Sequence, residues 1–151
     1  MREGEEHTSP VVLACRGRAE AVARDLLVVD TSAGSSNNVS VAIEDSDLVV
    51  AVTEPTPLGL HDLKLILELT SRMGLRTWVV VNRVGIGSEE GVAEVAKSFN
   101  VEVVARIPYS RDIVETYVKG VPIVSSMPSH PISKVFKDLA LRVTEVVGSG
   151  S

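Results

Sequence analysis

Short apolar runs alternate with amphipathic stretches along the whole chain. Four runs have the length and β-branched content of strands, and they span residues 26–29, 48–52, 78–81 and 101–107. The first three are apolar at consecutive positions, a pattern typical of parallel strands buried on both faces. The pattern predicts a three-layer α/β fold, with a mostly parallel sheet of about four strands and helices on both faces.

The predicted helices lie between and after these runs. In the stretch from about Thr56 to Met73, one face is apolar and the opposite face is charged at i, i+4 spacing. Thr56 before a proline is typical of a helix N-cap, and Gly74 is typical of a helix end. The other helices are expected to begin at Ser9, near Ser88, at Ser110 and at Pro131.

Composition fits one folded domain, expected over residues 1–147 with a flexible Gly/Ser tail at 148–151. Apolar residues make up 44% of the 151 positions, charged residues 23%, and the formal net charge is −5. This acidic balance argues against general binding to nucleic acid or to an anionic membrane. No apolar run is long enough to span a bilayer, and the acidic N-terminus does not resemble a signal peptide. We therefore expect a cytoplasmic protein.

Cys15 is the only cysteine in the sequence. A disulfide within the chain is therefore impossible, and no iron–sulfur cluster with cysteine ligands is expected in it. Cys15 falls on the apolar side of the first predicted helix, so the pattern predicts a buried core residue rather than a reactive thiol.

Candidate chemistry lies where the predicted strands end, because ligands of open α/β sheets bind outside the carboxyl ends of the strands. Asp30 follows the first run, and a carboxylate there can hold Mg²⁺ directly or through water. The small residues after it, among them Ser32, Ala33 and Gly34, allow a close approach to a phosphate. The alternative is an ordinary aspartate that begins a turn.

Two further strand ends carry polar or ring-bearing residues. Asn82 has both a donor and an acceptor for the edge of a base, and Arg83 can stack on that base. An Asx turn and a solvated arginine are the alternatives. Pro108 and Tyr109 follow the fourth run and can line a pocket wall. Glu54 follows the second run without an evident partner.

Taken in order, these segments resemble the MinD/ParA/Mrp-like P-loop ATPases, and especially their branch with an inserted ferredoxin domain. The resemblance covers roughly residues 4–147. Residues 26–34 look like the Walker B and switch II segment, and residues 52–63 are similar to a stretch specific to the ferredoxin-bearing branch. Val80–Arg83 and Ile107–Tyr109 look like the adenine-binding segments, and Val121–Ile123 like the turn after them.

The resemblance implies a P-loop NTPase fold and an ATP or ADP site with Mg²⁺. Asp30 would hold the metal, and the loop from Ser32 would sense the γ-phosphate. Asn82, Arg83, Pro108 and Tyr109 would hold adenine. The sequence departs from the family pattern because no Gly-x-x-x-x-Gly-Lys-Ser/Thr motif occurs in it. That motif supplies most of the phosphate contacts, so the chain alone is expected to be inactive as an ATPase.

In this family the P-loop strand lies between the strand that ends at Asp30 and the strand that ends at Thr53. Without it, two strand edges would face a gap, and unpaired buried backbone is costly. Three routes are open: direct pairing of the two strands, a strand donated by a separate P-loop-bearing chain, or exchange within a homo-oligomer. The alternative function is a non-catalytic interaction module. A weaker one is an iron–sulfur delivery role.

Overall fold

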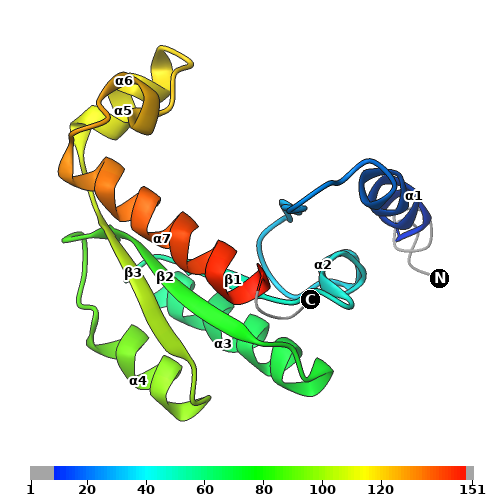
Figure 1. Ribbon diagram of the computed structural model, residues 1–151. Helices are drawn as coiled ribbons and strands as arrows, with labels where there is room; N and C mark the ends of the chain where they lie inside the picture. The colour runs from blue at the N-terminus through cyan, green and yellow to red at the C-terminus, as the bar shows by residue number, and fades with distance from the viewer. Residues whose placement is uncertain (1–8, 149–151) are drawn as a thin grey trace.

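The computed structural model describes residues 9–148. Its elements in chain order are α1 (Ser9–Glu20), α2 (Asn37–Ile43), β1 (Val49–Thr53), α3 (Pro57–Met73), β2 (Thr77–Val84), α4 (Glu90–Ser98), β3 (Glu102–Pro108), α5 (Arg111–Val118), α6 (Ile123–Ser126) and α7 (Pro131–Gly148). The three strands form one parallel sheet in the order β1–β2–β3 (Figure 1). The fold is therefore α/β, as predicted.

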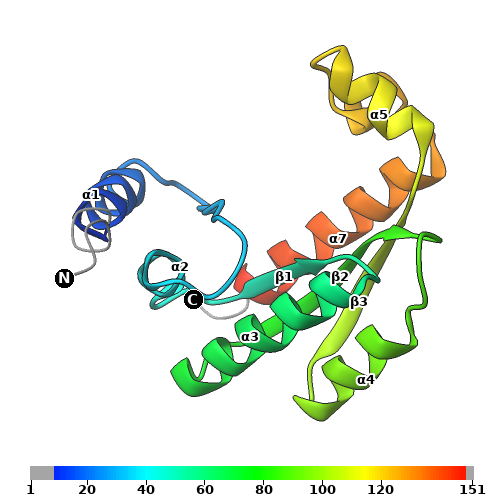
Figure 2. The same ribbon diagram turned by 180° about the vertical axis from the view of Figure 1, so that it is seen from behind.

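Helices cover both faces of this sheet. α3 and α4 lie on one face and α7 on the other, as Figures 1 and 2 show from opposite sides. Val79 and Val81 of the central strand pack toward α3 and α4, while Val80 packs toward α7. Each of these three valines is at most 1% exposed. β2 is thus buried on both faces, which explains its unbroken apolar run.

Local signals in the sequence set the ends of α3. The Gly59 N–H donates to Thr56 Oγ1 at 3.1 Å, and Pro57 occupies the first turn. Gly74 ends the helix with a φ of +68°, a left-handed conformation that favours glycine. Leu63 and Leu67 are the buried face, and each is 1% exposed. The predicted helix over 56–73 is confirmed.

The prediction of a strand at residues 26–29 is wrong, so the sheet has three strands rather than about four. Among the described residues, the 24–36 segment contains no helix or strand, and β1 pairs only with β2. Val28 is 78% exposed. An apolar run becomes a strand only when a partner satisfies its backbone, and none lies beside this one. Direct pairing with β1 is therefore not the arrangement found. We call the unpaired side of β1 its open edge.

The expected burial of Cys15 is also wrong. The thiol is exposed, and Val11 on the same helix is 65% exposed. α1 packs on α2 rather than on the sheet, and it lies to the side of the molecule (Figure 1). Cys15 and Val11 on its apolar side are therefore not packed against the sheet. The predicted tail largely lies outside the described residues, although Gly148 is the last residue of α7.

Candidate functional site

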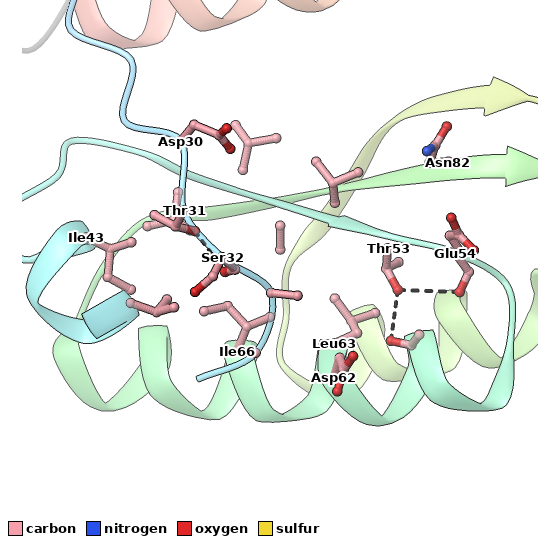
Figure 3. Close-up of a pocket in the computed structure, with 18 of the residues that line it drawn as sticks. Asp30, Thr31, Ser32, Ile43, Thr53, Glu54, Asp62, Leu63, Ile66 and Asn82 are labelled. Atoms are coloured by element: carbon pink, nitrogen blue, oxygen red, sulfur yellow. Dashed lines mark hydrogen bonds between the residues drawn. The ribbon is translucent and has the colours of Figure 1, made fainter. Parts of the chain in front are cut away.

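A pocket of about 530 Å³ lies along the open edge of β1. One wall is formed by residues 29–34, and the others come from α2, from β1 with the start of α3, and from β2 (Figure 3). The structure brings five of the predicted site residues to this pocket: Asp30, Ser32, Ala33, Gly34 and Asn82.

The wall formed by residues 29–34 carries a free carboxylate. Asp30 is exposed, and its side chain makes no hydrogen bond or ion pair to a described residue. The Thr31 hydroxyl donates to the carbonyl of Ser32 at 3.3 Å. Mg²⁺ in nucleotide sites is commonly held by one or two carboxylates together with phosphates and water. The donor chemistry of this wall fits that ion.

At the opposite end of the pocket, residues from the carboxyl ends of β1 and β2 meet. The Thr53 hydroxyl, on a residue only 6% exposed, donates to the Gly59 carbonyl at 2.8 Å. Glu54 Oε1 lies 3.2 Å from Arg83 Nη1. Asn82 is half-buried beside this ion pair and lines the pocket. Arg83 has a φ of +53°, which is uncommon for a residue with a side chain.

The loop after β1 is held by two close backbone contacts. A Cβ on Gly59 would lie 2.3 Å from the Glu54 carbonyl oxygen, and one on Gly87 would lie 2.0 Å from the Pro55 carbonyl oxygen. Only glycine fits at both positions without moving the backbone. The position of Glu54 at the pocket is therefore fixed by its surroundings.

The two ends of the pocket are separate. Figure 3 shows Asp30 and Thr31 beside Ile43 of α2, away from Thr53, Glu54 and Asn82. We expected Asp30 and Asn82 to meet at one edge of the sheet, but Asp30 follows no strand and nothing aligns it with the strand ends. The two residues share the pocket without being adjacent in it.

Pro108 and Tyr109 lie at the end of β3 and are not among the residues that line this pocket. The Tyr109 N–H donates to the Val84 carbonyl at 3.0 Å, and its side chain is 57% exposed. Their role in holding a base stays a prediction.

Sequence reasoning missed two features of the site. It found no partner for Glu54, which pairs with Arg83, and it did not include the buried Thr53 hydroxyl. The first could have been found, because parallel neighbouring strands bring the residues after their ends together. The role of the Thr53 hydroxyl could not have been found, because its acceptor is the Gly59 carbonyl in α3 and no local sequence pattern indicates that contact.

Within residues 9–148, no group of three or more His, Cys, Asp or Glu side chains is arranged so that it could hold a metal ion. In the same range, no helix combines the length and the apolar character needed to cross a bilayer.

Known proteins resemble the chain over most of its length, although no family model matches it. Protein MJ0579 of Methanocaldococcus jannaschii is 33% identical over 117 residues, which are 78% of this chain and 40% of that protein. The ATP-binding protein MJ0685 of the same organism is 24% identical over 79% of the chain and 48% of its own length. The septum site-determining protein MinD of Thermotoga maritima is 28% identical over 79% of the chain and 46% of its own length. The chain thus spans about half the length of these curated relatives or less.

Solved structures show the same fold. The MinD cell division protein of Aquifex aeolicus superimposes with a TM-score of 0.70 at 22% identity, over 89% of this chain and 59% of that one. A ParA family ATPase from Chlorobium tepidum superimposes with a TM-score of 0.66. Homologues and structural neighbours therefore agree: they are P-loop ATPases of the MinD/ParA family, which the chain resembles over part of their length and whose fold it shares.

Proposed function

We propose that this chain carries the magnesium side and the adenine side of an ATP site of the MinD/ParA type. The observation that carries the proposal is the pocket itself, which collects Asp30, residues 32–34 and Asn82 along the open edge of β1. The ATP-binding name of the relative MJ0685 supports the choice of nucleotide.

Asp30 has the metal-holding role in this proposal. Its carboxylate is exposed, borders the pocket and has no competing partner among the described residues. Mg²⁺ bound there would neutralise phosphate charge. Ser32 to Gly34 follow directly and offer a hydroxyl and backbone N–H groups along the same wall. These are groups that bind phosphate oxygens.

Asn82 and Arg83 have the base-binding role. The Asn82 amide offers a donor and an acceptor to the adenine edge. The ion pair with Glu54 holds the Arg83 guanidinium at the carboxyl ends of β1 and β2, and its planar face can stack on a base. Pro108 and Tyr109 would complete the base pocket from β3.

Phosphate binding by this chain alone is expected to be weak. The sequence contains no Gly-x-x-x-x-Gly-Lys-Ser/Thr motif, and that loop and its lysine supply most phosphate contacts in P-loop enzymes. We therefore expect nucleotide binding without ATP hydrolysis by the 151-residue chain.

A titration with a fluorescent ATP analogue, with and without Mg²⁺, tests the proposal. Asp30→Ala is expected to abolish the Mg²⁺ dependence, and Asn82→Ala to weaken binding about tenfold through the lost base hydrogen bonds. Asp138→Ala, an exposed aspartate on α7 outside the pocket, is the matched control and should bind like the parent chain. Binding that is unchanged in both site variants would contradict the proposal.

The open edge of β1 favours a second candidate, a non-catalytic interaction module. In that case the chain keeps the fold for binding another polypeptide and has no nucleotide affinity. An absence of saturable binding at millimolar nucleotide would favour this candidate over the first.

A further inference from the structure

His130 joins the start of α7 to the start of α5. Its Nδ1 accepts a hydrogen bond from the Ile132 N–H at 3.2 Å, and its Nε2 lies 3.2 Å from Asp112 Oδ2. The ring is 25% exposed, so protons from the solvent reach it. None of these three residues lines the candidate nucleotide pocket.

The bond to Ile132 caps α7. Pro131 is the first residue of the helix and has no N–H to donate, so the Ile132 N–H is the first donor of the helix. The N–H groups of a first turn have no partner within the helix, and the side chain just before the helix can satisfy one of them. Ile132 is 3% exposed, and an N–H left without a partner at a buried residue is costly.

The capping bond requires one protonation state of the ring. An imidazole nitrogen that accepts a hydrogen bond carries no proton, so the capping ring is neutral and has its N–H at Nε2, on the side of Asp112. A second proton would go to Nδ1, which would then present an N–H to the N–H of Ile132. The protonated ring therefore loses the capping bond, while its attraction to the Asp112 carboxylate grows.

The charged groups around the ring act on it in opposite directions. On α5, the negative charge of Asp112 favours the protonated ring. On α7, the helix N-terminus and Lys134, one turn further on, disfavour a second positive charge. Lys137 of the same helix donates to the Pro128 carbonyl at 2.8 Å, at this end of α7. Residues 120–129, which include α6, contain no titratable side chain. The other charged side chains of α5 and of the first two turns of α7 are exposed, and they are Arg111, Glu115 and Asp138.

We propose that His130 is a pH-dependent cap, which holds the start of α7 when it is neutral and pairs with Asp112 of α5 instead when it is protonated. An unperturbed imidazole changes its charge between about pH 5 and 8. Acidification in this range would therefore exchange one partner of the ring for the other.

The exchange would reach α5 and α6 through the first turn of α7. Ser133, in that turn, bonds to the Met127 carbonyl at the end of α6. α5 and α6 pack together at the end of β3 (Figure 1). Loss of the cap would loosen the turn that holds them. An effect on nucleotide binding would rest on the proposed function, whereas the exchange of partners rests on the contacts of His130 alone.

Amide hydrogen exchange and the ring ¹⁵N signals of His130 test the proposal by NMR, on the 151-residue chain without nucleotide. At about pH 7.5 the ring proton should be on Nε2. At about pH 5.5 the protection factor of the Ile132 amide should be about tenfold lower than at the higher pH. The loss of protection should follow the titration of the His130 ring.

Three variants separate the cap from a general effect of acid. His130→Asn keeps a hydrogen-bond acceptor before the helix but does not titrate, so the Ile132 amide should stay protected at both pH values. His61→Asn is the matched control, because it removes an exposed histidine of α3 and should keep the pH dependence of the parent chain. Asp112→Asn removes the partner of the protonated ring, so the loss of protection should move to lower pH by about half a unit or more.

Four results would overturn the inference. They are a proton on Nδ1 at the higher pH, equal protection of the Ile132 amide at the two pH values, the same pH dependence in His130→Asn as in the parent chain, and an unshifted midpoint in Asp112→Asn. A failure of the chain to bind ATP would reject the proposed function and leave this inference unchanged, because none of these measurements uses nucleotide.

Discussion

Gly59 lies where a side chain has no room. A Cβ there would meet the Glu54 carbonyl oxygen at 2.3 Å, and that oxygen belongs to the backbone of a tight loop. Gly59→Ala should therefore lower the free energy of unfolding by about 2 kcal/mol, measured by urea denaturation. Gly17→Ala is the control, because Gly17 is also helical and a Cβ there would meet nothing within 4 Å. There the change should be neutral or stabilising. Equal effects at the two positions would contradict the packing argument.

Arg83 combines a left-handed backbone with an ion pair, and two substitutions separate these features. Arg83→Ala and Arg83→Gly both remove the contact with Glu54, but only glycine adopts a φ of +53° without cost. The glycine variant should be more stable than the alanine variant by about 1 kcal/mol in the same denaturation assay. A more stable alanine variant would show that the backbone conformation carries no strain.

At the scale of elements, α6 is joined to the start of α7 by one buried hydroxyl. Ser133 is fully buried, and its Oγ lies 2.7 Å from the Met127 carbonyl oxygen and 3.2 Å from that of Ile123. Ser133→Ala should cost about 1 kcal/mol of stability and shift the NMR signals of α6. Ser125→Ala changes an exposed serine of α6 and should leave the stability unchanged, with signal shifts confined to residue 125 and its direct neighbours. Unchanged α6 signals in the Ser133 variant would contradict this role.

Elements with their own end signals were predictable from the sequence. The caps at Thr56 and Ser110 and the left-handed glycines at 74 and 120 mark helix ends where the structure has them. The run at 26–29 has as strong a strand pattern as β1, yet it forms no strand, because strand formation depends on a neighbour that local sequence does not describe. The short helices α2 and α6 lacked a pattern long enough to predict them.

At the scale of the whole molecule, the sequence predicted five of the residues that line the pocket, but not how they are arranged in it. Strand-end reasoning placed Asn82 at the pocket through the parallel pairing of β1 and β2. The same reasoning did not give the position of Asp30 within the pocket. The path of residues 24–36 depends on long-range packing against other elements, and a local sequence pattern does not describe such packing.

The start of the connection between α1 and α2 should be the most accessible part of the described chain. Residues 21–26 are exposed, and among the described residues the side chain of Arg24 has no partner. Limited trypsin digestion should therefore cut first after Arg24. Arg76, whose guanidinium carbon lies 5.8 Å from the centre of the Trp78 ring, is the internal comparison and should be cut later. Earlier cleavage after Arg76 would contradict this order.

The uncharged edge of β1 also has a consequence for handling the protein. An apolar strand with free backbone groups is a template for intermolecular cross-β stacking. Concentrated solutions of the chain should therefore form thioflavin-positive aggregates that start at residues 49–53, and Val52→Lys should delay them. The substitution would then make the protein more soluble, because it places a charge among the five residues that would otherwise stack.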